Sequence, residues 1–107
     1  MTKTPWAGLI DQEVEEILIG RQRLEIAWRD RVLRIVGAWQ LLDARELRLE
    51  GGEGAELGRT TQLHRLLGDR PAAWRFQGGD EVVLYFASGL ALVLRESSLS
   101  LSEVEGT

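Results

Sequence analysis

Residues 13–36, EVEEILIGRQRLEIAWRDRVLRIV, carry the pattern that decides the fold. On both sides of Gly20-Arg21, large apolar residues stand at alternate positions, and a period of two is the signature of β-strands. Glycine at the break supplies the positive φ that a tight hairpin needs. A third apolar run, Val32–Val36, follows the turn Arg29-Asp30-Arg31. The stretch therefore predicts three antiparallel strands joined by tight turns.

The same order of apolar runs and turns returns in residues 70–94, RPAAWRFQGGDEVVLYFASGLALVL. We predict that the two stretches form similar β units that bury matching faces. The residues expected in the core are Ile17, Leu24, Ile26, Trp74, Val82 and Leu84. In the third strand of the first unit, the inward pair is left open between Leu33/Ile35 and Val32/Val36, because a shift of one residue reverses the faces.

A short helix is predicted before each unit. Thr4-Pro5 reads as an N-cap and a first helical residue ahead of Trp6–Ile10. In the second unit, Thr60 or Thr61 is placed to cap Gln62–Leu67, and Gly68 follows as a terminating glycine.

The expected fold class is α+β, mainly β: two pseudo-repeated antiparallel β units, each preceded by a short helix. A chain of 107 residues fits a single domain, 1–107. The pseudo-repeats span about 9–50 and 66–102, joined by a Gly-rich loop at 51–58. Residues 38–42 and 47–50 add a hairpin to the first. One longer β pattern with a single helix is the alternative.

Composition excludes several classes of function. The chain has no cysteine, which rules out disulfides, thiol catalysis and thiolate zinc sites. A net charge of −4 argues against non-specific binding to nucleic acid or to a membrane surface. The longest uncharged apolar run, Phe86–Leu94, is too short to cross a bilayer as a helix. We expect a cytoplasmic protein.

Catalytic and cofactor motifs are weak. In the loop 51–58 the glycines stand one residue off the dinucleotide-binding spacing, and its two glutamates would repel phosphates. His64 is the sole histidine, which leaves too few ligands for a His-rich metal site. Ser88 lacks the motif that exposes a nucleophile. We therefore expect no enzyme, no metal and no cofactor.

Arg21–Arg34 is the one basic stretch, with five Arg against two acidic residues and with Trp28 among them. Arginine beside an aromatic residue can stack on bases and neutralise phosphates. The other interpretation, which we favour, is a solvent-exposed face that pairs with the acidic residues of Asp11–Glu16.

Four tryptophans offer candidate binding anchors, because Trp and Arg are enriched in interface hot spots. Trp28 and Trp74 fall on the repeated apolar face and are assigned to the core. Trp39 and Trp6 stand outside it, Trp39 being the first choice as anchor, and a role as lids over the core stays open. The candidate partner-binding residues are Trp39, Trp6, Glu15, Glu16, Arg29 and Arg31.

Several short motifs resemble a family of small proteins from high-GC bacteria with a duplicated β-hairpin pattern and no assigned activity. The matching features are Leu9, Ile10 and Val14, Ile19-Gly20-Arg21, Gly37-Ala38-Trp39, and a second Leu-Leu-Gly from Leu66. The resemblance covers most of residues 9–95. It implies the duplicated fold and transfers no functional residues.

The predicted function is a bacterial, non-enzymatic protein-binding module, an immunity-type or accessory protein, monomeric or homodimeric. Its net acidic charge suits a protein partner with a basic surface, whereas nucleic acid and membrane are not expected as partners. The alternative is a small nucleic-acid or nucleotide-binding domain that uses the Arg21–Arg34 face or the Gly51–Gly58 loop.

Overall fold

A computed structural model describes residues 5–20, 23–53, 61–96 and 99–103 of the chain. These ranges are mainly β and antiparallel, as predicted. The elements in chain order are η1 (Pro5–Leu9), β1 (Glu16–Gly20), β2 (Arg23–Ala27), β3 (Arg31–Ile35), β4 (Ala38–Leu42), β5 (Arg48–Glu53), η2 (Thr61–Leu66), β6 (Pro71–Gln77), β7 (Glu81–Phe86), β8 (Ala91–Arg95) and β9 (Leu99–Glu103).

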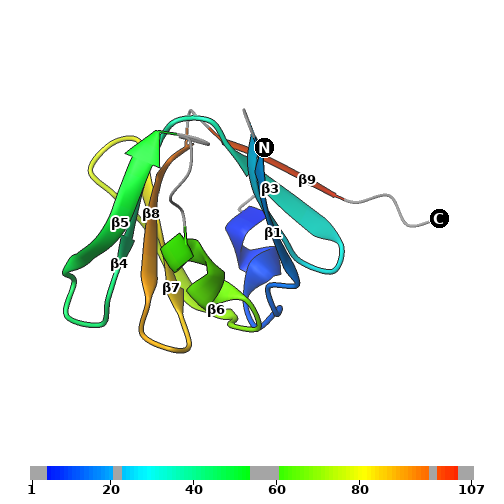
Figure 1. Ribbon diagram of the computed structural model, residues 1–107, viewed down its shortest axis with the longest axis horizontal. Coiled ribbons are helices and arrows are strands. Elements are labelled where there is room, and N and C mark those ends of the chain that lie inside the picture. Colours follow the sequence, from blue (N-terminus) through cyan, green and yellow to red (C-terminus); the bar gives the residue numbers. More distant parts are fainter. Residues whose placement is uncertain (1–4, 21–22, 54–60, 97–98, 104–107) are drawn as a thin grey trace.

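The strands form two antiparallel sheets that pack face to face (Figure 1). Sheet A has the order β1-β2-β3-β9, and sheet B has the order β5-β4-β8-β7-β6. The core between them takes alternate residues from each strand, as period-two patterning requires. Its fully buried members include Leu24, Ile26, Leu33, Ile35, Leu41, Leu84 and Leu92.

The predicted core is largely confirmed. Of the six residues expected inside, all but Trp74 are buried, and Trp74 is half-buried against the core. The open register of the third strand is resolved in favour of Leu33 and Ile35, which are buried, whereas Val36 is exposed.

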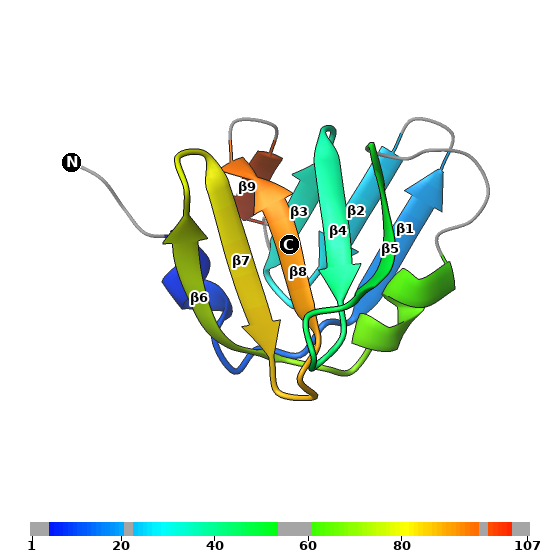
Figure 2. The same ribbon diagram turned by 90° about the vertical axis from the view of Figure 1, so that its left-hand side faces the viewer.

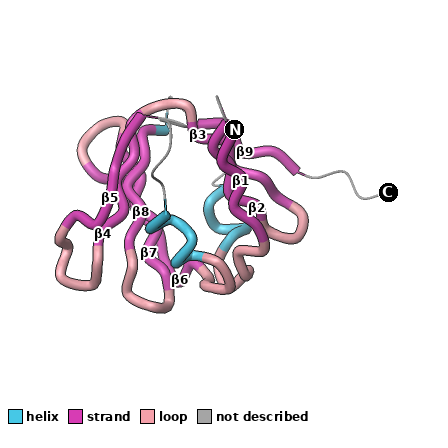
Figure 3. The backbone as a smooth tube through the Cα atoms, viewed as in Figure 1, coloured by secondary structure: helices cyan, strands magenta, loops and turns pink. Residues whose placement is uncertain are grey.

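The two segments predicted as short helices form single 3-10 helices, η1 and η2, and neither is an α-helix. Each helix buries two large residues three positions apart, Trp6 with Leu9 and Leu63 with Leu66. A 3-10 helix aligns residues i and i+3 on one side, so it suits this spacing in a segment too short for an α-helix. The helices close opposite open sides of the space between the sheets (Figures 2 and 3).

The chain passes from one sheet to the other twice, each time after a three-stranded meander. β1, β2 and β3 lie in sheet A, and the next strand, β4, joins sheet B beside β8. β6, β7 and β8 lie in sheet B, and the next strand, β9, joins sheet A beside β3. β4, which follows the meander β1–β3 in the chain, thus extends the sheet of β6–β8, and β9, which follows β6–β8, extends the sheet of β1–β3.

Strand β5 corrects the predicted loop at 51–58. Gly51 and Gly52 pair with Gln40 and Trp39 in the β4–β5 ladder, so they belong to a strand. Glycine is required at 51 because a Cβ there would lie 2.9 Å from the Trp39 carbonyl oxygen. Residues 54–60 of the predicted loop lie outside the described residues.

Candidate binding surfaces

The two tryptophans considered as binding anchors are buried, so they are not exposed, and their burial agrees with the alternative role of lids over the core. Trp39 is 2% exposed and lies opposite Leu94 on the inner face of sheet B. Trp6 is 1% exposed in η1, and its indole Nε1 donates to Glu96 Oε2 at 3.3 Å. Both side chains fill the space between the sheets, because alternation in β4 and the 3-10 spacing of η1 turn them inward. Neither can anchor a partner.

The charged candidates occupy different surroundings. Glu15 and Glu16 are exposed where β1 begins, and Arg29 is exposed in the β2–β3 turn at the same end of sheet A. The Arg31 guanidinium lies against η1, so close that a Cβ at Gly8 would be 2.5 Å from its Nη1. Arg31 is therefore half-buried and packs against the fold.

The basic stretch does not form one face. Arg34 projects from the outer face of sheet A, where its Nε donates to Glu25 Oε2 at 3.0 Å. Glu25 is the only buried charged residue in the described part of the chain. Arg29 lies in a turn and Arg31 against η1, so these arginines do not line a common nucleic-acid groove. Arg21 lies outside the described residues.

An exposed aromatic pair lies instead on strand β6. The rings of Trp74 and Phe76 meet edge to face, with centroids 5.3 Å apart and planes at 82°. Trp74 is half-buried, and Phe76 is 49% exposed. The two residues are opposite Leu84 and Val82, so both are on the inner face of sheet B.

Phe76 is exposed because β6 is the edge strand of sheet B. η1 lies behind β6 (Figure 2), and the Asp11 amide donates to the Pro71 carbonyl oxygen at 2.8 Å, so the first residue of the strand is covered. Among the described strands, none pairs with the outer edge of β6 at residues 73–77. The surface thus combines free backbone groups with exposed aromatic area.

The sequence carried a signal for this edge. Proline cannot donate to a sheet ladder, so Pro71 at the start of the run indicates an edge strand. The inner-face residues of an edge strand are incompletely covered, and this places Trp74 and Phe76 at the surface. The sequence pattern assigns Trp74 to the repeated apolar face, and for this reason it does not predict an exposed aromatic pair on β6.

The remaining candidate residues do not form a binding or catalytic site within the described part of the chain. His64 is exposed on η2. Within the described residues, no group of three or more His, Asp or Glu side chains is placed to hold a metal ion. In the same part of the chain, no helix has the length and apolar character needed to cross a membrane.

Comparisons with protein-family models, with curated proteins and with solved structures found no match to this chain. The resemblance to a family of small high-GC bacterial proteins therefore stays a prediction.

Proposed function

We propose that this chain is a non-enzymatic protein-binding module, a bacterial cytoplasmic protein of the accessory or immunity type, and that it engages its partner through the free edge of β6. The observation that carries the proposal is the exposed Trp74–Phe76 pair beside unpaired backbone groups. Aromatic side chains supply large contact area with few rotatable bonds, and they dominate interface hot spots.

The edge of β6 suits β-strand addition. In this binding mode, an extended segment of the partner pairs with a free sheet edge and places alternate side chains against pockets beside it. Long, flat, apolar edges are ordinarily protected by charges or by a covering element. β6 is seven residues long, and Arg75 is its only charged residue. This edge has little protection against pairing, as a strand-addition site requires.

Charge supports a basic partner. Glu15 and Glu16 are exposed on a chain of net charge −4, and no ion pair joins either of them to another described residue. Reversing both charges is expected to slow association several-fold at low salt with little change in dissociation, because exposed charges act mainly on diffusional encounter. Stopped-flow or surface-binding kinetics at two salt concentrations test this.

We also infer that the chain is built from two pseudo-repeats, η1–β4 and η2–β9. Matching hydrogen bonds support the inference. Asp11 donates to Pro71 O and Gly68 donates to Val14 O, both at 2.8 Å, so the segments that follow η1 and η2 bond to each other reciprocally. Asp11 and Gly68 also share a positive φ, of 66° and 78°. The strand order of each meander is the same, and each is completed by the strand that follows the other.

The proposed repeat provides a matched control for the binding test. Ile19 on β1 occupies the place of Phe76 on β6, and it is 37% exposed against 49% for Phe76. The full-length protein, Phe76→Ser and Ile19→Ser are each used for affinity capture from the native host, followed by mass spectrometry. We expect the wild type and Ile19→Ser to retain one protein that Phe76→Ser loses. The loss corresponds to a binding free energy weakened by about 2 kcal/mol or more.

Hydrogen exchange on the captured complex checks the mode of binding. Amides of residues 73–77 that face outward are expected to exchange more slowly when the partner is bound, because strand addition gives them acceptors. Retention of the partner by Phe76→Ser would remove β6 as the binding edge. If no protein is enriched over an unrelated bait, the chain is not a protein-binding module.

A further inference from the structure

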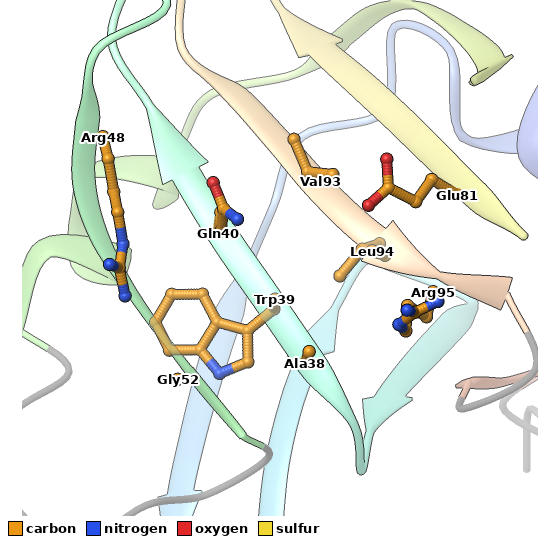
Figure 4. Close-up of a pocket in the computed structure, with 9 residues that line it drawn as sticks. All are labelled: Ala38, Trp39, Gln40, Arg48, Gly52, Glu81, Val93, Leu94 and Arg95. Atoms are coloured by element: carbon orange, nitrogen blue, oxygen red, sulfur yellow. The ribbon is translucent and has the colours of Figure 1, made fainter. Parts of the chain in front are cut away.

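The outer face of sheet B is hollowed by a pocket of about 300 Å³. The pocket crosses β5, β4, β8 and β7, where small residues separate long ones. Ala38 and Gly52 are the smallest residues of its lining, and its polar side chains are those of Arg48, Gln40, Glu81 and Arg95 (Figure 4). This volume is at the lower end of the range for small-molecule sites.

The Arg48 side chain lies close to the sheet on this face. Its guanidinium lies over Gly51, where a Cβ would be 2.7 Å from Nη2 and 2.9 Å from Nε. Glycine at 51 thus lets the guanidinium rest close to the sheet beside Gln40, the residue paired with Gly51.

Arg48 and Gln40 have unused hydrogen-bonding capacity. Within the described part of the chain, no carboxylate lies within ion-pair distance of Arg48, and the Gln40 amide has no hydrogen-bond partner. On the opposite wall, Arg95 is 3.9 Å from Asp80, and Glu81 accepts a hydrogen bond from Gln77 at 3.2 Å. The acidic groups of that wall therefore already have neighbours.

The described side chains of this face carry more positive than negative charge, although the chain is acidic. The strand register places Arg75 and Val83 in the same row as Val93 and Gln40, and it pairs Glu81 with Arg95. With Arg48, and with the Asp80 that lies beside Arg95, the described side chains of this face include three arginines and two carboxylates. An anionic ligand is the complement of such a surface.

We propose that this pocket binds a small organic carboxylate, held by the Arg48 guanidinium and the Gln40 amide. A guanidinium presents two parallel N–H groups that match the two oxygens of a carboxylate, and the amide NH₂ adds a third donor. Val93 and Ala38 give the carbon portion of the ligand an apolar contact. The carboxylate belongs either to a free organic acid or to an acidic side chain of a peptide.

The test is an NMR titration of the full chain with succinate, with uncharged succinamide, with inorganic phosphate, and with N-acetyl-Ala-Glu-Ala-amide. We expect succinate or the peptide to shift the amides of Gly52 and Val93, and succinamide to leave them unchanged. The tighter of the two carboxylates identifies the source, free acid or acidic side chain.

Arg48→Gln removes the charge from an exposed side chain and leaves the fold intact, and it is expected to weaken binding about tenfold or more. Arg45→Gln, in the turn of the same hairpin, makes the same change outside the pocket and is expected to bind as the wild type does. Absence of carboxylate binding, equal binding of phosphate, or unchanged binding by Arg48→Gln would overturn the proposal. Arg48 and Phe76 lie on opposite faces of sheet B, so this result is independent of the β6 edge.

Discussion

The regions 5–35 and 61–95 each contain a 3-10 helix followed by three consecutive antiparallel strands, the order expected of the proposed pseudo-repeats, yet their outward surfaces differ. At the centre of sheet A, Glu25 is paired in register with Arg34. At the corresponding place in sheet B, Val83 is paired with Val93. The inward residues stay apolar in both because burial between the sheets demands it. The outward pairs are not buried between the sheets, so their chemistry can differ. Glu25–Arg34 is an ion pair, whereas Val83–Val93 is an apolar pair.

The edge strands differ in the same way. Exposed Glu15 precedes β1 and exposed Glu16 begins it, and such charges protect an edge from pairing with another chain. β6 carries Trp74 and Phe76 at its edge instead. Under the proposed repeat, Ile17 and Ile19 of β1 correspond to Trp74 and Phe76, so both edges carry apolar side chains. The β1 edge adds exposed carboxylates, whereas the β6 edge has the exposed aromatic pair, and for this reason we assign the binding edge to β6.

The largest expected effect concerns the strands that complete each meander. Trp39 on β4 lies opposite Leu94, and Leu99 on β9 lies opposite Ile35. Trp39 is buried, whereas Leu99 is only partly buried. We expect Trp39→Ala to lower the free energy of unfolding by about 3–5 kcal/mol, as for other buried tryptophans, and Leu99→Ala to cost clearly less. Urea unfolding measures both; equal costs would contradict the unequal burial.

The next effect tests whether the two inner faces are equivalent. Ile26 and Leu84 are both fully buried at the centre of their strands. Truncation of either to Ala is expected to cost about 2–5 kcal/mol, a large part of the stability of a small domain. Both variants are expected to lower the denaturation midpoint in a single transition. A second transition in either variant would show that the halves unfold separately.

Substitution of the outward pair Glu25–Arg34 by valine tests the difference between the outer faces of sheets A and B. Arg34→Val alone removes the guanidinium that bonds the buried Glu25 carboxylate and is expected to cost about 1–3 kcal/mol, a value reduced because Arg34 is half-exposed and screened. The double change Glu25→Val, Arg34→Val copies sheet B and is expected to unfold within about 1 kcal/mol of the wild type. A double variant as unstable as the single one would mean that the ion pair stabilises sheet A.

The smallest expected effect is at the ends of the 3-10 helices. Gly68 has φ 78° and Asp11 has φ 66°. Gly68→Ala is expected to cost about 1–2 kcal/mol because a Cβ strains this conformation. Asp11→Gly is expected to change stability by less than about 1 kcal/mol, since Asp tolerates the left-handed region. Thermal unfolding of the two variants measures the difference, and a neutral Gly68→Ala would contradict it.

Local pattern predicted much of the fold. Period-two alternation located β1, β2, β3, β7 and β8, and the glycine turns marked the hairpin between β6 and β7. The same pattern did not predict the burial of Trp39 or the strand at Gly51 and Gly52, because both depend on segments distant in the sequence. Trp39 follows the expected small-residue step, but whether it faces the core depends on the strand that lies opposite. Gly51 and Gly52 read as a loop, because a glycine pair gives no sign that β4 will lie beside it.

The pattern of residues alone predicted that this chain forms antiparallel strands, where most of them turn, and which residues of β1, β2 and β7 point inward, because these features depend on neighbours two to ten residues away. The inward residues of β3 were settled only by its pairing in the structure. Only the tertiary structure decided that β4 joins β8 and that β9 joins β3. It also buried Trp39, exposed Phe76 and brought Arg48 beside Gln40. These outcomes depend on pairings between distant segments, whose free energy comes from burial and hydrogen bonds formed only when both sheets are complete.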